Sequence, residues 1–445
     1  MKTNSIFHPT IKTIAAAFVA VSLIESAHCA EKPASPQLAD WTIMIFLNAD
    51  NNLEQDALNN FADIAKIGST DKVNIVVQFD RNGNYATTNP QWTQTLRFLV
   101  KKGMVPTPST AVQDIGEADM GDGAVLKAFV DWAKEKYPAR HYFLEIWDHG
   151  QGWRVMMRSS LDEFRAAAPE QPRRSAAFRS VSVDDTNGGN QLYNRKIQDA
   201  LSGYGLDLIG FDACLMSMVE TAYALRGVAH VMVGSEELEP GEGWKYDDWL
   251  KKLQANPSMD AVGLGSLLVD SYKRTYGDND ATTLSAIDLS KAEGLATAVS
   301  ALGDQLETEL QKNPSVVTQA RTNCAVYAPN TFGDGRDYFQ HIDLGYFCDQ
   351  LHGPNRNSSQ VKEAADQVRA AVKGCVLANY ASKQRMGAFG STGLAIYFPK
   401  SGAIYKGDPY QENGYEKDNQ NYPVEFVQKF HWGDFLHQYF AKVPN

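Results

Sequence analysis

Short apolar segments alternate with helical patterns along the chain, and this alternation restricts the fold more than any other feature. Residues 41–47 and 73–79 are nearly continuous runs of β-forming residues, as in strands buried on both faces of a parallel sheet. Further strands are predicted at residues 141–147, 206–211, 228–234, 282–287 and 393–398, and helices at 51–66, 122–137, 194–202, 216–226 and 422–440. This order predicts an α/β fold with a mostly parallel central sheet flanked by helices.

The chain is long enough for more than one compact unit. Its 445 residues correspond to about two to four domains at roughly 150 residues each. We assign residues 41–290 to the α/β core, and residues 291–445 to a C-terminal helical extension that completes the fold.

Composition and charge exclude several classes of protein. The hydrophobic fraction of 43% and the charged fraction of 21% are those of a folded globular protein. The 42 basic and 53 acidic residues give a net charge of -11. Such a chain repels nucleic acid phosphates and anionic membrane surfaces, so we expect neither as a partner.

The first 30 residues have the pattern of a secretory signal peptide. Lys2 and Lys12 precede an apolar run at residues 14–24, which is too short to span a bilayer. We expect cleavage near Cys29 or Ala30, then a leader at residues 31–40 and a periplasmic or secreted protein without a membrane span. Lipidation of Cys29 is an alternative.

Four cysteines remain after removal of the signal peptide. They are Cys214, Cys324, Cys348 and Cys375. Four cysteines in a chain of this length do not make a disulfide scaffold, and no Cys-x-x-Cys spacing indicates zinc. The sequence does not determine the disulfide pairing of Cys324, Cys348 and Cys375, and we expect at least one free thiol.

Two predicted strands end in residues that can carry chemistry. His149-Gly150 follows one strand, and Cys214 lies between another strand and a predicted helix. A helix N-terminus favours the nucleophilic thiolate, and a neighbouring imidazole can assist it. The backbone N–H groups of Gly150 and Cys214 are candidate oxyanion donors. The alternative is an ordinary turn beside a small buried cysteine.

Several separated motifs support a shared chemical role for His149 and Cys214. His149 lies 65 residues before Cys214, and this order resembles the caspase-like group of cysteine peptidases. The sequence is most similar to the clostripain family at Leu47-Asn-Ala-Asp-Asn-Asn-Leu-Glu54, Trp147-Asp-His-Gly-Gln-Gly-Trp153, Asp212-Ala-Cys-Leu-Met216, residues 236–244 and Gly393-Leu-Ala-Ile-Tyr-Phe-Pro399. The resemblance implies a caspase-like sandwich fold.

The resemblance also implies a catalytic pair and a substrate class. His149 and Cys214 would be the catalytic dyad of an endopeptidase that cuts protein or peptide substrates after Arg or Lys. Asp212, two residues before the cysteine, can pair with the basic side chain, with Glu242 as a further pocket residue. The alternative for Asp212 is a carboxylate that stabilises its own helix.

We expect no required cofactor and assign no metal ligands. The segment from Asp50 to Glu54 is rich in oxygen ligands but lacks an EF-hand pattern, and Asn51 or Asn52 is better interpreted as a helix cap. The resemblance to clostripain leaves open whether the protein uses calcium. Asp148 is expected to pair structurally rather than to orient His149.

An arginine-rich segment at residues 154–180 interrupts the α/β pattern. It contains few large apolar residues, which indicates an exposed loop. A peptidase that cuts after basic residues can cleave its own exposed loop, and clostripain implies such activation. Arg173, Arg174 and Arg179 are the candidate processing sites, ahead of two other arginines, Arg158 and Arg165. An ordinary surface loop is the alternative.

Two other functions compete with the peptidase. One is a catalytically silent clostripain-like binding protein or adhesin. The other is a metal- or carboxylate-dependent hydrolase. The presence of both His149 and Cys214 favours the peptidase.

Overall fold

Burial along the first strand shows why this sequence forms a sheet covered on both faces. In β1 (Ala39–Ala49), Ile43, Ile45 and Leu47 belong to one hydrophobic cluster, whereas Met44 and Phe46 belong to another. Successive side chains of a strand point to opposite faces, so each face has its own core. The computed structural model describes residues 38–86, 92–154, 181–278, 280–330, 337, 339–353, 358–407 and 415–445.

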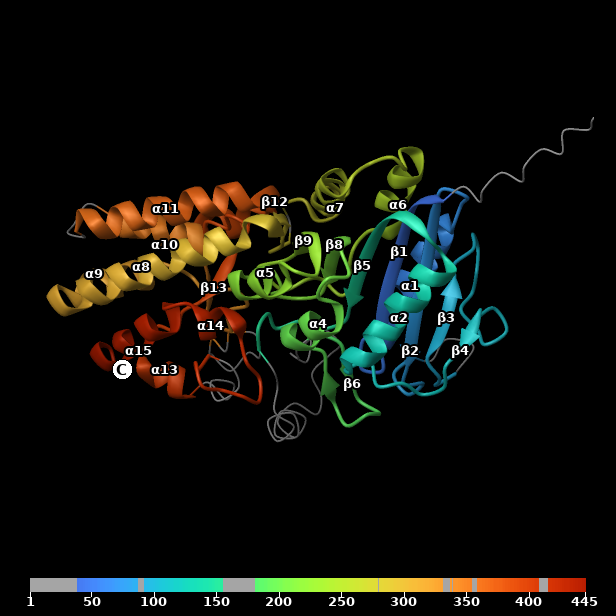
Figure 1. Ribbon diagram of the computed structural model, residues 1–445, viewed down its shortest axis with the longest axis horizontal. Coiled ribbons are helices and arrows are strands. Elements are labelled where there is room, and N and C mark those ends of the chain that lie inside the picture. Colours follow the sequence, from blue (N-terminus) through green and yellow to red (C-terminus); the bar gives the residue numbers. More distant parts are fainter. Residues whose placement is uncertain are drawn as a thin grey trace, which may run out of the picture. The chain divides into compact units, whose positions relative to one another are not determined.

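In the described part of the chain the central sheet has nine strands, and its middle is parallel (Figure 1). The pairs β9–β8, β8–β5, β5–β1 and β1–β2 are parallel, and the outer pairs are antiparallel. In spatial order the strands are β12 (Val376–Ala381), β10 (Thr283–Asp288), β9 (Ala229–Gly234), β8 (Leu206–Asp212), β5 (Ala139–Trp147), β1, β2 (Val73–Arg81), β3 (Leu96–Leu99) and β4 (Gln113–Asp114).

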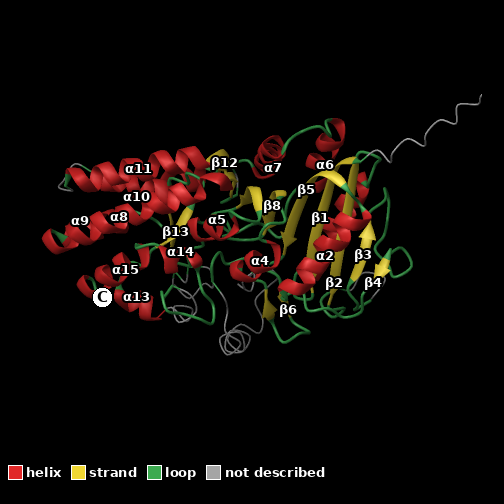
Figure 2. Ribbon diagram, viewed as in Figure 1, coloured by secondary structure: helices red, strands yellow, loops and turns green. Residues whose placement is uncertain are grey.

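Helices cover both faces of this sheet, as the secondary-structure colouring of Figure 2 shows. Buried residues of three helices contribute to the cluster on one face: α1 (Glu54–Ile67), α6 (Tyr246–Ala255) and α7 (Ala261–Tyr276). Three others contribute to the cluster on the opposite face: α2 (Gly123–Lys136), α4 (Asn194–Leu201) and α5 (Val219–Leu225). The α/β sandwich with a mostly parallel sheet is therefore confirmed.

The C-terminal part is mainly helical. After the 3-10 helix Leu289–Lys291, its helices are α8 (Ala292–Lys312), α9 (Pro314–Thr322), α10 (Leu344–Leu351), α11 (Ser359–Cys375), α12 (Lys383–Phe389), α13 (Gly402–Gly407), α14 (Glu425–Lys429) and α15 (Trp432–Lys442). Two small antiparallel sheets join β11 (His341–Asp343) to β13 (Ala395–Tyr397) and β6 (Val183–Asp184) to β7 (Asn190–Gln191). No helix in the described part of the chain is long and apolar enough to cross a membrane.

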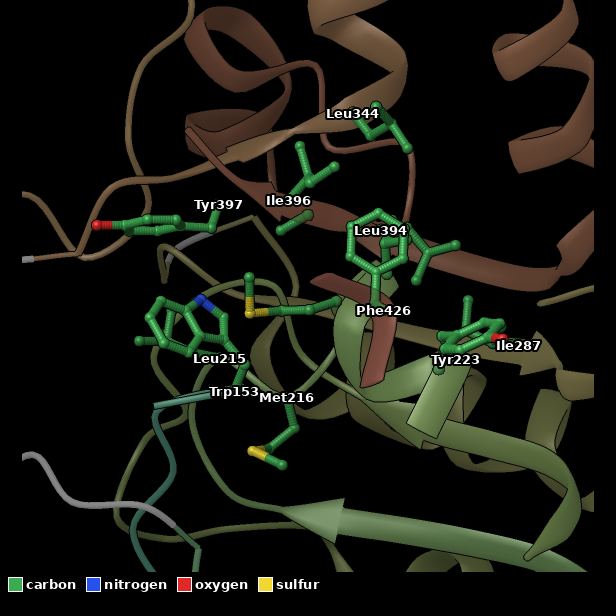
Figure 3. Packing of buried hydrophobic residues seen from close by; sticks show 14 of the residues in the cluster. Trp153, Leu215, Met216, Tyr223, Ile287, Leu344, Leu394, Ile396, Tyr397 and Phe426 are labelled. Carbon is green, nitrogen blue, oxygen red and sulfur yellow. The ribbon is translucent and has the colours of Figure 1, made fainter. Parts of the chain in front are cut away.

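Apolar contacts join the C-terminal part to the segment after β8. Figure 3 shows Leu394 and Ile396, near and on β13, in one buried cluster with Leu215 and Met216. The amide N–H of Ala395 also donates to the carbonyl of Ser217 at 2.9 Å. Residues far apart in the sequence thus share one core.

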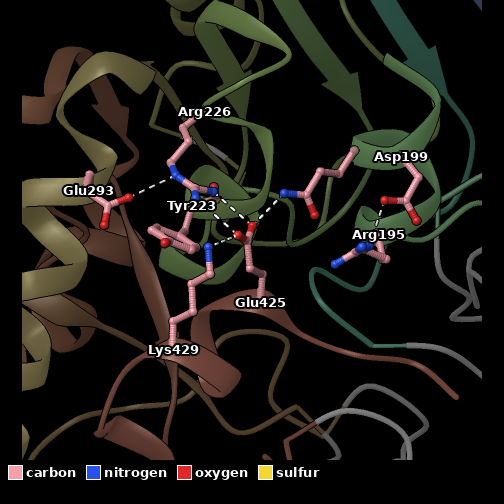
Figure 4. Close-up of polar contacts among 8 residues, drawn as sticks. Arg195, Asp199, Tyr223, Arg226, Glu293, Glu425 and Lys429 are labelled. Carbon is pink, nitrogen blue, oxygen red and sulfur yellow. Dashed lines mark hydrogen bonds and ion pairs between the residues drawn. The ribbon is translucent and has the colours of Figure 1, made fainter. Parts of the chain in front are cut away.

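A partly buried ion pair makes a second connection (Figure 4). The Arg226 guanidinium donates to both carboxylate oxygens of Glu425, at 2.9 and 3.1 Å, while Lys429 and Gln198 bond the same carboxylate. Although burial opposes ionisation, these hydrogen bonds lower the pKa of Glu425 to about 2. The network ties α14 to α4 and to the end of α5.

Three sequence predictions need correction. The predicted strand at 393–398 forms β13 in a small sheet instead of joining the central sheet. The predicted helix at 422–440 is two helices, because Phe430 between them is extended. The predicted helix at 216–226 begins only at Val219, because the backbones of Ser217 and Met218 pair with neighbouring segments.

Buried Glu220 on α5 should make stability depend on pH. Its carboxyl accepts from Tyr415 Oη at 2.7 Å and Tyr397 N at 3.0 Å, and burial raises its pKa from 4.5 to about 7. Between these pH values the folded chain holds a proton that the unfolded chain has released, so stability falls as pH rises. The stability of Glu220→Gln relative to wild type should therefore increase over this range, by at most about 3 kcal/mol.

Denaturant titrations from pH 4.5 to 7 would measure this difference. Glu363→Gln, at an exposed position of α11, is the control for loss of one acidic group. A difference between Glu220→Gln and wild type that is constant over the range would contradict the prediction.

Candidate active site

Adjacent parallel strands carry the two candidate reactive residues. In the pairing of β5 with β8, Trp147 lies opposite Asp212, the last residue of its strand. His149 and Cys214 each follow this pair by two residues. Because parallel strands end at the same edge of the sheet, the two loops leave together, as expected from the sequence.

Two glycines bring these loops into backbone contact. A Cβ atom added to Gly150 would lie 2.2 Å from the carbonyl oxygen of Cys214 and 2.8 Å from its nitrogen. A Cβ added to Gly152 would lie 2.2 Å from the sulfur of Met218. Leu215, directly after the cysteine, has a φ of 63° in the left-handed region. The close approach therefore requires the absence of side chains on one loop and a sharp turn in the other.

The imidazole of His149 is buried and is hydrogen-bonded through Nε2. Its partner is Asn52 Oδ1, at 3.1 Å. Asp148 instead bonds structural partners, accepting from Asn51 Nδ2 at 2.9 Å and from Val183 N at 2.5 Å. The expected structural pairing of Asp148 is confirmed.

Asn51 and Asn52 are not the helix caps that the sequence suggests. The N-cap of α1 is Leu53, which makes no side-chain cap hydrogen bond. Asn51 Oδ1 accepts from the Leu53 N–H at 2.9 Å, while its amide group holds Asp148. Sequence reasoning missed the contact of Asn52 with His149, although the motif at residues 47–54 contains both asparagines.

Cys214 is enclosed in a way that opposes ionisation. Its side chain is only 7% exposed, and Sγ accepts from the Glu239 N–H at 3.2 Å. Burial and the neighbouring Glu239 carboxyl raise the pKa of Cys214 to about 12, although the hydrogen bond from the Glu239 backbone opposes this. The expectation of a thiolate at a helix N-terminus is wrong for this conformation, because α5 begins at Val219.

Three buried carboxyl groups form one cluster, and two of them, Asp212 and Glu239, lie near the cysteine. Asp212 is 5% exposed and accepts from Trp244 N at 2.9 Å and from Tyr246 Oη at 2.8 Å. Tyr246 Oη also bonds Glu145, and Glu239 accepts from Trp244 Nε1 at 2.9 Å. Burial raises the pKa of all three carboxyls, and the charge of Asp212 adds to the shifts of the other two. Asp212 bonds these residues and not α5, so the helix-stabilising alternative is wrong.

Glu242 lies at the outer side of this group. Its side chain is exposed, and its carbonyl accepts from Asn60 Nδ2 at 3.1 Å. The next residue, Gly243, is so close to Asp212 that an added Cβ would lie 2.6 Å from Oδ2. The structure therefore brings the segment containing Glu242 to Asp212 without assigning its carboxylate a partner.

Four other acidic residues form the candidate metal-binding group of the described chain: Asp50, Asp80, Glu117 and Asp184. Sequence reasoning included only Asp50 in a possible calcium segment. The other three are distant in sequence and carry no common motif, so only the fold brings them together.

Most of the arginine-rich segment lies outside the described residues, including Arg173, Arg174 and Arg179. Its first residue, Arg154, is fully buried, with its guanidinium over the rings of Phe339 and Tyr397. The predicted exposed loop therefore does not begin at residue 154. Cys214, Cys324, Cys348 and Cys375 are all free and buried.

Sequence comparison agrees with this geometry. The sequence profile described as the clostripain family matches residues 45–439, nearly the whole described chain. The chain belongs to the clostripain family of cysteine proteases. Clostripain from Hathewaya histolytica is 26% identical over 414 residues, which cover 82% of this chain and 75% of that protein.

Solved structures of other clostripain-family proteases share the fold. An inactive zymogen C11 protease from Parabacteroides distasonis aligns with a TM-score of 0.59 and 18% identity, covering 90% of this chain and 99% of its own. A secreted C11 cysteine protease from Bacteroides thetaiotaomicron, in complex with an irreversible peptide inhibitor, aligns with a TM-score of 0.57 and 20% identity. The alignment covers 92% of this chain and 100% of that protein's chain. The predicted caspase-like fold and cysteine protease class are confirmed, and peptides or proteins are the substrates.

Asn52 should support hydrolysis by holding the histidine ring. We expect Asn52→Ala to lower kcat roughly 3- to 10-fold, the value of one neutral hydrogen bond, with little change in KM. Steady-state kinetics on a peptide substrate would measure this, with Asn59→Ala, an exposed asparagine of the adjacent helix, as the matched control. Equal rates for the two variants would show that the contact with His149 has no catalytic effect.

Proposed function

We propose that this protein is an exported cysteine endopeptidase that cuts after Arg or Lys, with Cys214 as nucleophile and His149 as acid and base. The observation that carries this proposal is the pair of buried carboxyls near the cysteine, Asp212 and Glu239. Asp212 is two residues from Cys214, and Glu239 contacts the sulfur through its backbone.

The proposed reaction needs only the residues of the two packed loops. His149 removes the thiol proton, the sulfur attacks the substrate carbonyl, and the resulting oxyanion collapses with cleavage of the C–N bond. His149 returns the proton to the leaving amine, and water then hydrolyses the thioester. Within the described chain the N–H groups of Gly150 and Cys214 have no hydrogen-bond acceptor, which supports their role as oxyanion donors. No cofactor enters these steps.

The acid group explains a preference for basic side chains. Within the described residues, Glu145, Asp212 and Glu239 form no ion pair with Lys, Arg or His. One carboxyl oxygen of Glu145 and one of Glu239 are buried without a hydrogen-bond partner. A guanidinium or ammonium group would supply donors and positive charge to these acceptors. Exposed Glu242 would add negative charge at the entrance.

The described conformation must open before substrate can react. The segment that contains Glu239 and Trp244 encloses both the thiol and Asp212. We assign opening to cleavage of the arginine-rich segment, with Arg173, Arg174 and Arg179 as sites. The similarity to an inactive zymogen from Parabacteroides distasonis supports a closed precursor.

Export is supported by the N-terminal sequence. Residues 1–30 combine a basic start, a short apolar run and small residues near the expected cleavage site. The protease from Bacteroides thetaiotaomicron with a similar fold is described as secreted. These observations support our proposal of a periplasmic or secreted location.

Cys214→Ala should abolish both turnover and self-cleavage. The change removes the nucleophile while replacing one small buried side chain with another. Mass spectrometry should show wild type as two fragments that meet between residues 155 and 180, with residues 1–30 absent, and the variant as one chain. Cys375→Ala, which changes another buried free thiol, should remain active and cleaved. Turnover by Cys214→Ala would refute the assigned nucleophile, and an inactive wild type would favour a silent binding protein.

Asp212→Asn should change specificity more than it changes general activity. Loss of a charged hydrogen-bond partner should lower kcat/KM for Arg and Lys substrates roughly 10- to 100-fold. The matched substrate replaces arginine by neutral citrulline, and the matched variant is Asp207→Asn, on the same strand but bonded to His141. Equal losses on both substrates would mean that Asp212 acts only in folding.

A further inference from the structure

One carboxyl group of the acidic cluster lies in the middle of an apolar strand. Glu145 belongs to β5 and is fully buried, and it alternates with Phe143 and Trp147, which both belong to the hydrophobic cluster on one face of the sheet. In the pairing with β8 it lies opposite Gly210, two residues before Asp212. Glu145 and Asp212 are therefore on the same face of the sheet. An ionised carboxylate is costly in such apolar surroundings.

The hydroxyl of Tyr246 contacts both of these carboxyls. Its Oη lies 2.8 Å from Asp212 Oδ2 and is also hydrogen-bonded to Glu145 Oε1. A phenol has a single O–H, so Tyr246 can donate to only one of the two. The other contact is a hydrogen bond only if that carboxyl is protonated and donates to the Tyr246 oxygen. Together the two carboxyls therefore hold at least one proton.

The hydrogen bonds around the two carboxyls assign this proton to Glu145. Asp212 Oδ2 is within bonding distance of two donors, the Trp244 N–H and Tyr246 Oη, and donors favour an ionised acceptor. Glu145 Oε2, in contrast, is buried without a hydrogen-bond partner in the described chain. An unpaired oxygen costs less in a neutral carboxyl than in a carboxylate.

The acid strengths of the two groups agree with this assignment. Burial raises the pKa of Glu145 far above its usual value, and the charge of Asp212 adds to the shift. Burial raises the pKa of Asp212 only to about 6, because its hydrogen bonds, including those from Trp244 and Tyr246, oppose the shift. Above about pH 6, Asp212 is therefore ionised while Glu145 keeps its proton.

The groups that surround Asp212 do not take over its charge. Exposed Glu242 interacts with Tyr276 at the outer side of the site. Burial raises the pKa of the other ionisable groups that interact with Asp212 in the described chain, which are Glu239, Cys214, Tyr272 and Tyr276. Asp212 is therefore the buried group of this site that is ionised at neutral pH.

We propose that Glu145 and Tyr246 are positioning residues for substrate specificity. A protonated Glu145 donates to Tyr246 Oη, and Tyr246 in turn donates to the carboxylate of Asp212. This order of donors keeps Asp212 ionised and in place to pair with an Arg or Lys side chain. The effect on specificity rests on the proposed function, whereas the position of the proton does not.

The three residues lie on regular elements of the fold. Glu145 and Asp212 belong to the paired strands β5 and β8, and Tyr246 is the first residue of α6, where its ring packs against Trp249 at a centroid distance of 6.0 Å. The arrangement therefore does not depend on the contact of Glu239 with the thiol, which must break when substrate enters.

The proton on Glu145 can be measured without any enzyme activity. In the Cys214→Ala chain at about pH 8, where Asp212 is ionised, infrared difference spectroscopy should show a carboxylic acid C=O band that is lost when Glu145→Gln is added. Glu363→Gln, at an exposed position of α11, is the matched control and should leave the band unchanged. No loss of this band in the folded Glu145→Gln chain would overturn the proposal.

The effect on specificity is measured as the ratio of kcat/KM for an Arg substrate to that for its citrulline analogue. Contributions of His149 and Cys214 cancel in this ratio, so its pH dependence reports the ionisation of Asp212. In wild type the ratio should rise through about pH 6. Glu145→Gln should leave this rise unchanged, because the amide N–H of glutamine can still donate to Tyr246.

Tyr246→Phe should change the ratio because Asp212 loses a donor. The rise should move upward by about one to two pH units, which lowers the ratio roughly 5- to 50-fold at about pH 6. Tyr204→Phe is the matched control, because it removes a tyrosine-to-aspartate hydrogen bond, to Asp131, away from the site. It should leave the ratio unchanged at every pH.

Three kinetic results would overturn the proposal. They are a downward move of the rise in Glu145→Gln, which would mean that Glu145 is ionised in wild type, a loss in that variant as large as in Asp212→Asn, and an unchanged rise in Tyr246→Phe. A wild-type ratio near one at every pH, with the infrared band present, would instead refute the proposed cleavage after Arg or Lys, while the proton would remain assigned to Glu145.

Discussion

The parallel pairing of β5 with β8 is the constraint on which the candidate site depends. Trp147 and Asp212 are opposite each other, so the histidine and cysteine loops start from the same level of one sheet edge. A one-residue slip would turn Asp212 to the other face and move Cys214 along the edge. Gly150 then lets the loops touch at backbone distance. The sheet register therefore determines the proximity of the two loops.

Some acidic residues have a basic partner, whereas others have none among the described residues. Glu425 has a guanidinium partner, and Glu237 has Arg385. The carboxyls around Asp212, and those around Asp80, have no such partner within the described residues. Burial without a basic partner raises the pKa of Asp212, Glu145 and Glu239, so these carboxyls favour the neutral form more than exposed acids do until a positively charged group comes near. The net charge of the chain alone predicts neither group.

Much of the fold could be predicted from sequence because buried parallel strands are continuous apolar runs. The pattern at residues 41–47 and 73–79 led directly to β1 and β2. The same reasoning located the candidate pair by motif, but it did not show that Glu145 and Glu239 reach Asp212. Glu145 is joined to Asp212 through Tyr246, and Glu239 bonds Trp244, whose backbone bonds Asp212. Helix prediction from the local sequence also failed at the start of α5, where the backbone instead pairs with distant segments. Ser217, for example, bonds Ser235 and Ala395 in place of beginning α5.

One segment encloses both halves of the proposed site. The Glu239 N–H bonds the thiol, and the Trp244 N–H bonds Asp212. Burial is the largest cause of the raised pKa of Cys214, and nearby carboxyls add to it. Movement of this segment would admit water to the thiol and a cationic side chain to the acids. Both changes lower the cost of forming thiolate, the first by solvation and the second by opposing the negative charge. Substrate recognition and activation of the nucleophile would therefore be linked through a single movement of the backbone.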